Sequence, residues 1–233
     1  MRAIPYIVLF VFLFSLSRYV LSDDSGAKAI FHTGEGPTVI ASNSEVESNA
    51  GKKSEIVKTE KYMGISYWID LLESNGKLTR VSPTKTFSSG DRIKLIIESN
   101  RNGYLYVLNI GSSGNSHVLF PNPGVKSNLI TAGLPYAIPF KTYMRFDSTP
   151  GEETLLIMLS PRPVENFGPS TPAYGPLDNQ QTNQVIQMAR TTGAKDIILE
   201  NDSLGPAPAT YAVAPVSSLE SKAITLQVKL MHK

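Results

Sequence analysis

From Tyr62 onward, short apolar segments alternate with turns rich in Gly, Pro, Asn and Ser. In residues 91–99, Ile93, Leu95 and Ile97 fall on one face, and residues 223–230 alternate apolar and polar positions in the same way. A period of two is typical of half-buried strands. Further strands are predicted at 66–73, 76–81, 103–110, 116–121, 134–139, 143–147, 154–160, 194–200 and 209–215. Many short strands separated by turns predict an all-β protein, an antiparallel β-sandwich of immunoglobulin-like or related form.

One helix interrupts this pattern. Residues 162–177 are rich in proline and are expected to form an irregular loop. Asp178 is a suitable N-cap, Gln181 stands at the capping-box position, and Gly193 can end the helix that we predict over 179–191. The expected organisation is therefore a single β-sandwich domain over residues 62–233 with one short helix between strands.

The N-terminal 61 residues have a different pattern. A basic start, an apolar run from Ile4 to Leu16 and small residues before Asp23 predict a signal peptide over residues 1–22. An uncleaved membrane anchor is the alternative, but a spanning helix needs about 20 apolar residues, and Arg18 interrupts the run. Residues 23–61 hold few apolar positions and are expected to form a flexible tether. The protein is thus predicted to be exported, periplasmic or extracellular, with no stable membrane span after cleavage.

Charge and cysteine content narrow the classes of function. The chain has 22 Lys plus Arg and 20 Asp plus Glu. Removing residues 1–22 takes away Arg2 and Arg18, so the two sums become equal. No basic cluster that could neutralise phosphates remains, so nucleic acid is not an expected partner. The absence of cysteine excludes thiol chemistry, disulfides and cysteine-based zinc sites, and it favours a bacterial envelope protein.

No motif predicts catalysis, a metal or a cofactor. The three histidines are His32, His117 and His232, and no G-x-S-x-G elbow is present. His117 is interpreted as a strand-edge residue rather than a base. Gly111-Ser112-Ser113-Gly114 is followed by a strand pattern, which favours a hairpin loop over a phosphate-binding loop.

The remaining candidate is an aromatic platform in residues 103–110. Tyr104 and Tyr106 share one face of this strand, and Leu105 and Val107 share the other. If exposed, the tyrosines could bind peptide or sugar together with Asn109 and His117. Alternatively, they cover a second layer of the core.

The same region carries a resemblance to a known family. The segments "FSSGDRIKL" (87–95), "NRNGYLYVLN" (100–109), "HVLFPN" (117–122) and "PGEE" (150–153) resemble the bacterial domain of unknown function 4384. The resemblance covers about residues 65–165. It implies an exported all-β protein and transfers no catalytic residue.

The sequence therefore predicts a non-catalytic, exported interaction module of the bacterial cell envelope. Its partner would be a protein or an envelope polymer. Two alternatives stay open, an envelope hydrolase that uses His117 as its base and a structural subunit that associates through an edge strand.

Overall fold

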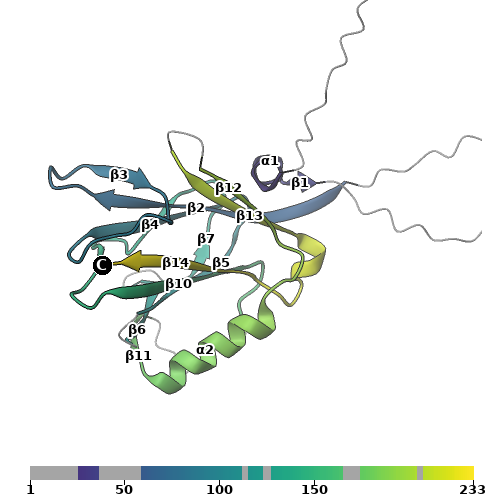
Figure 1. The fold of residues 1–233 in the computed structure, drawn as a ribbon. Helices are drawn as coiled ribbons and strands as arrows, with labels where there is room; N and C mark the ends of the chain where they lie inside the picture. The colour runs from purple at the N-terminus through teal and green to yellow at the C-terminus, as the bar shows by residue number, and fades with distance from the viewer. Residues whose placement is uncertain (1–25, 37–58, 112–114, 123–126, 165–173, 204–206) are drawn as a thin grey trace, which may run out of the picture.

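The computed structural model describes residues 26–36, 59–111, 115–122, 127–164, 174–203 and 207–233, and the predicted signal segment lies outside them. Two antiparallel sheets face each other (Figure 1). The first contains β12 (Ile198–Asp202), β13 (Ala209–Pro215), β2 (Glu60–Leu72), β4 (Arg92–Ser99) and β8 (Tyr136–Ile138) in this order, with β1 (Glu35–Gly36) and β3 (Leu78–Val81) on β2 and β9 (Met144–Arg145) on β4. The second contains β11 (Gly175–Leu177), β6 (Ser116–Phe120), β5 (Gly103–Ile110), β10 (Gly151–Ser160) and β14 (Ile224–His232), with β7 (Leu129–Ile130) on β5. The predicted all-β sandwich is confirmed.

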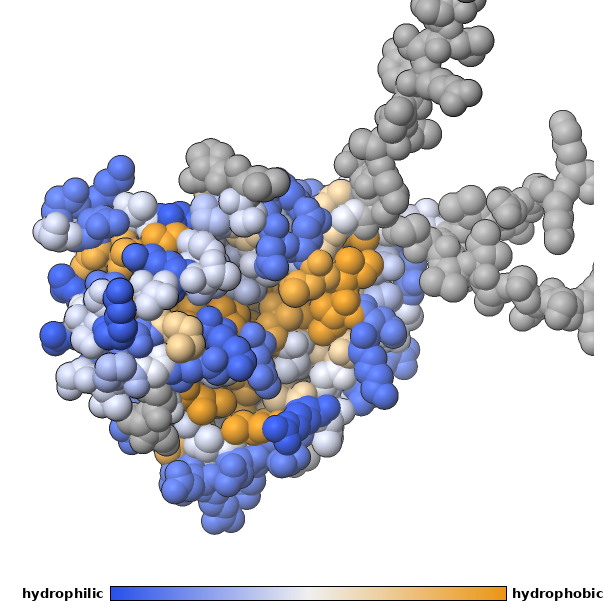
Figure 2. Space-filling model, viewed as in Figure 1, coloured by the Kyte–Doolittle hydropathy of each residue, from blue (hydrophilic) through white to orange (hydrophobic). Residues whose placement is uncertain are grey.

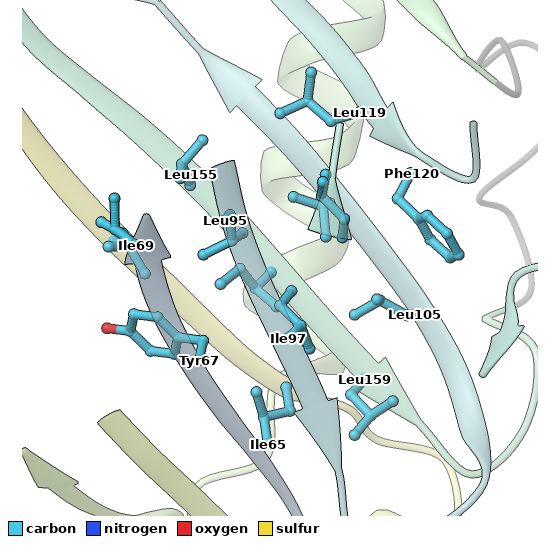
Figure 3. Packing of buried hydrophobic residues seen from close by; sticks show 14 of the residues in the cluster. Ile65, Tyr67, Ile69, Leu95, Ile97, Leu105, Leu119, Phe120, Leu155 and Leu159 are labelled. Atoms are coloured by element: carbon cyan, nitrogen blue, oxygen red, sulfur yellow. The ribbon is translucent and has the colours of Figure 1, made fainter. Parts of the chain in front are cut away.

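The main core lies between the two sheets. Side chains from β2 and β4, such as Ile65 and Ile97, point toward Leu105 of β5 and Leu155 and Leu159 of β10 (Figure 3). All five are fully buried. The alternation read from the sequence therefore places these residues on the inner faces of the strands.

A second, smaller core covers the outer face of the second sheet. The helix α2 (Asn179–Thr192) packs Val185 and Ala189 over Leu108, Leu156 and other residues of β5 and β10. Its N-terminus has the predicted capping box, in which Asp178 accepts the Gln181 backbone N–H at 2.7 Å and Gln181 accepts the Asp178 N–H at 3.0 Å. Central strands of this sheet are thus buried on both faces, which explains the apolar run 155–159.

The prediction of a tether over residues 23–61 is wrong for residues 60–61, with which β2 begins, and for residues 26–36. They form the helix α1 (Ala27–Thr33) and strand β1, and α1 packs on the outer face of the first sheet. Ile30 and Phe31 are buried against Tyr62 and Val213. A helix of seven residues is too short to show a periodic pattern and is stable only through such packing. Sequence composition therefore could not reveal it.

Two further differences concern the predicted loops and strands. Residues 175–177, expected within an irregular loop, form β11 and pair with β6; residues 165–173 of that loop lie outside the described part of the chain. The predicted strand 194–200 is observed only as β12, which begins at Ile198. Ala194 instead donates its N–H to Ala223 next to β14, so residues 195–197 cross from the edge of the second sheet to β12 in the first.

The turns agree with the sequence signals. Gly76 adopts a φ of +81° between β2 and β3, where Gly is favoured because it lacks a Cβ. The strands on either side of the predicted hairpin loop, β5 and β6, pair antiparallel, and Gly111 donates its N–H to Asn115. Residues 112–114 of that loop lie outside the described part of the chain.

Candidate functional site

The four residues predicted as one platform lie on two opposite faces of the second sheet. Tyr106 is only 6% exposed and packs beneath α2, and Tyr104 is half-buried against the same cluster. The Tyr106 hydroxyl accepts the Val164 backbone N–H at 3.0 Å. Asn109 and His117 lie directly opposite each other on β5 and β6 and face the other way. The tyrosines therefore form a second core layer, and an exposed platform of all four residues is excluded.

Asn109 and His117 instead line a pocket at one end of the sandwich. The pocket has a volume of about 380 Å³ and opens between the ends of β5, β6 and β10 and the segment 139–147. Its apolar part comes from the inner faces of both sheets and contains Ile93, Leu119, Leu155 and Leu230. Its polar part contains side chains from several distant segments. Clefts of this size that combine apolar surface with convergent polar groups are typical of small-ligand sites.

The polar part of the pocket is organised around Asn109. Its side-chain Nδ2 donates to Glu153 Oε2 of β10 at 3.1 Å, and both residues are half-buried. His117 is exposed beside Asn109. The expectation that His117 stands at a sheet edge is wrong, because β6 is paired with β5 on one side and β11 on the other. An amide, a carboxylate and an imidazole thus converge on one side of the pocket.

Aromatic side chains also line the pocket. Tyr143 and Tyr174 both line the pocket, and Tyr174 is 40% exposed. Lys94 holds the Tyr143 segment in place: its Nζ donates to the carbonyls of Pro139 and Phe140 at 3.1 and 3.0 Å and lies 4.9 Å from the Tyr143 ring. Burial lowers the pKa of Lys94, and the two carbonyl bonds compensate part of this desolvation. The Tyr143 segment of the pocket is therefore fixed by a buried ammonium group.

The three histidines do not combine into a catalytic group. His32 lies on α1 beside Tyr211, and His232 at the end of β14 is buried with its ring against Phe146. His232 Nε2 is 3.8 Å from Asp147 Oδ1, yet its side chain has no exposed surface. Only His117 could reach a molecule in the pocket.

Within the described ranges, no three His, Asp or Glu side chains come close enough together to bind a metal ion. No helix among the residues that the structure describes has the length and apolar character needed to cross a membrane.

Sequence reasoning found Asn109 and His117 but missed their companions. The pocket also contains Glu153 of β10, Tyr143 next to β9 and Tyr174 next to β11. No local motif connects these positions. Glu153 could have been found only through the register that places β10 beside β5. The pocket is a product of the tertiary fold.

The comparisons with known proteins agree with the resemblance seen in the sequence. No curated protein and no solved structure matches this chain. A family match spans the strands from β4 to β10 and contains most of the pocket, including Asn109 and Glu153, together with Lys94, which binds the Pro139 carbonyl beside it. The resemblance is confirmed: residues 86–163 match the family described as Domain of unknown function (DUF4384).

Proposed function

We propose that this protein is a non-catalytic binding module of the bacterial cell envelope and that its ligand occupies the pocket beside Asn109. The observation that supports this most is the convergence of Asn109, His117 and Glu153 on a partly apolar cavity within the segment that resembles the family. Binding sites commonly combine an apolar body with a few placed polar groups. The pocket has this composition.

The lining favours a saccharide-containing envelope polymer as the ligand. A sugar ring presents apolar C–H faces and hydroxyl groups that both donate and accept hydrogen bonds. Tyr143 and Tyr174 offer aromatic surface for the apolar C–H faces. The Glu153 carboxylate and the Asn109 amide offer hydrogen-bond partners for the hydroxyl groups. The strands β5, β6 and β10 beside the pocket are paired on both sides, so their backbones are not available to a peptide strand.

Binding of peptidoglycan fragments to the purified full-length chain tests this proposal. We expect disaccharide fragments to bind in titration calorimetry and Asn109→Ala to weaken binding by about tenfold or more, because a ligand hydroxyl would lose a buried polar partner. Gln187→Ala is the matched control, since Gln187 is exposed on α2 away from the pocket. If no fragment binds, or if both variants behave alike, the proposal is wrong.

The competing proposal is a hydrolase, and it is supported only by the position of His117 in the same pocket. The same titrations distinguish it, because a hydrolase would release shortened fragments that mass spectrometry detects. Product formation that disappears in His117→Ala would establish the hydrolase and overturn a purely binding role.

Export is the second part of the proposal and rests on the order of basic, apolar and small residues in positions 1–22. We expect the protein isolated from the envelope fraction of a bacterial host to begin at Asp23. N-terminal sequencing checks this, with a variant carrying Val20→Arg and Ser22→Arg as the control that should remain unprocessed. Recovery of a chain that still begins at Met1 would contradict cleavage.

A further inference from the structure

The outer edge of β14 is closed at both ends by neighbouring backbone. At one end the Ala194 N–H donates to the Ala223 carbonyl, and at the other end the Phe87 N–H donates to the Met231 carbonyl. Both neighbours run parallel to β14, as isolated bridges. The opposite side of β14 is paired with β10 along its whole length. Neighbouring backbone therefore pairs with the two ends of this edge, and we call these two segments the caps.

Between the two caps, the backbone of β14 remains unpaired. Alternate residues of a strand direct their N–H and C=O groups to the same side. The backbone carbonyls of Ala223 and Met231 point outward, away from β10. The backbone groups of Thr225, Gln227 and Lys229 therefore point outward too. In the described part of the chain, none of these three makes a backbone hydrogen bond on that side. They offer alternating donors and acceptors in strand geometry.

An apolar strip runs beside this gap. Leu226 of β14 and Ile197 are half-buried against the main core, and Leu199 of β12 is 55% exposed. Figure 2 shows apolar side chains gathered over the middle of this side of the molecule, between β14 and the strands β12 and β13. Unpaired backbone next to apolar surface is the combination that strand addition uses, since backbone bonds give affinity and alternate side chains give specificity.

We propose that the gap between Ala194 and Phe87 binds a short extended peptide as an added strand on β14. The caps argue against a second copy of this chain as the molecule that pairs with this edge. A strand that belongs to another sheet would continue past both ends of the gap and collide with Ala194 and Phe87, whereas a short peptide can enter and leave between them.

The charges around the gap define the chemistry of the peptide. Lys85 and Lys195 lie in the two capping segments, and Lys229 lies within the gap. The acidic groups nearby are Asp196, which follows Lys195, and Glu152, which already pairs with Lys229 at 3.0 Å. Lys85 and Lys195 at the two ends of the gap favour a peptide that alternates apolar residues toward the strip with acidic residues toward solvent. This site is separate from the pocket and does not depend on the proposed function.

A set of heptapeptides that alternate Val, Ile or Leu with Glu tests the proposal on the full-length chain. Nuclear magnetic resonance is expected to show slowed amide hydrogen exchange at Thr225, Gln227 and Lys229 when a peptide binds, while Leu226 and Val228, already bonded to β10, stay unchanged. N-methylation of the peptide amides that face β14 should abolish binding, and N-methylation of the other set should not.

Gln227→Pro and Gln227→Ala form the matched pair of variants. Proline removes the outward N–H at the edge while the ladder to β10 is kept, so the fold should persist and binding should weaken by about tenfold or more. Gln227→Ala should bind normally. If no peptide binds, if Gln227→Pro binds as well as Gln227→Ala, or if the edge instead pairs two copies in sedimentation experiments, the proposal is overturned.

Discussion

Truncation of Leu105 to alanine is expected to lower the free energy of unfolding by about 2–5 kcal/mol, the usual range for a buried leucine. Leu105 has no exposed surface and lies on the inner face of β5 in the centre of the main core. Its neighbours come from both sheets (Figure 3), so the resulting cavity cannot collapse by the movement of one loop. Urea denaturation followed through the single tryptophan, Trp68, measures the change.

Tyr106 and Tyr104 provide the comparison within the same strand. Tyr106→Ala should cost about 3–5 kcal/mol, as for other buried aromatic residues, because it packs beneath α2. Tyr106→Phe should cost only about 0.5–1.5 kcal/mol, the net contribution of one hydrogen bond, here that from the Val164 N–H. Tyr104→Ala should cost less than Tyr106→Ala, since Tyr104 is only half-buried. If Tyr106→Ala left stability unchanged, the second core layer would be wrong.

Alternation predicted which residues of β5 share a face but not what covers that face. Tyr104 and Tyr106 look the same whether they face water or a helix, because the pattern has a period of two in both cases. The cover is α2, which lies more than 70 residues later and was itself predicted from its cap. The pocket has the same origin: Asn109 and Glu153 meet only because β10 pairs with β5.

The N-terminal helix α1 shows a second limit of prediction from the sequence. Residues 26–36 are polar enough to be read as a tether, yet Ile30 and Phe31 bury themselves on a sheet formed much later in the chain. Nothing local distinguishes such a segment from a disordered one, because its stability comes from partners remote in sequence. Turns, by contrast, were predicted reliably, because their signals are local in the sequence. The positive φ of Gly76 and Gly90 is a local requirement that the sequence displays directly.

The residues that carry the family resemblance have structural tasks at these remote contacts. Asp91 accepts the Ser88 N–H at 2.9 Å and, with Gly90, forms the turn into β4. Gly103 has no room for a side chain, because a Cβ would stand 3.0 Å from the Ser160 carbonyl oxygen and from Leu159. Asn100 connects β4 to the N-terminal helix. The residues that carry the resemblance thus lie where the two sheets and α1 are joined.

Asn100→Asp is expected to lower the free energy of unfolding by about 1–3 kcal/mol, the cost of leaving a partly buried polar group unpaired. Asn100 Oδ1 accepts the Gly64 N–H at 2.7 Å, and its Nδ2 donates to the Phe31 carbonyl at 3.0 Å. Aspartate keeps the first bond, loses the second and turns a carboxylate toward the carbonyl oxygens of Phe31 and Tyr62. The neighbouring Arg101 guanidinium, 2.8 Å from the Tyr62 oxygen, would offset part of this repulsion.

Asn102→Asp is the matched control two residues away. Asn102 is exposed and uses only its Oδ1, which accepts the Ala132 N–H at 2.9 Å, so aspartate preserves the bond and should change stability by no more than about 0.5 kcal/mol. Amide hydrogen exchange should accelerate in α1 of Asn100→Asp and stay unchanged in Asn102→Asp, because Asn100 binds the helix backbone and Asn102 binds Ala132 instead. Equal stability of the two variants, or an unchanged α1 in both, would show that the apolar contacts of the helix and the bonds of Lys28 to Glu200 and Asp202 hold it in place, and that the Asn100 network contributes nothing to its docking.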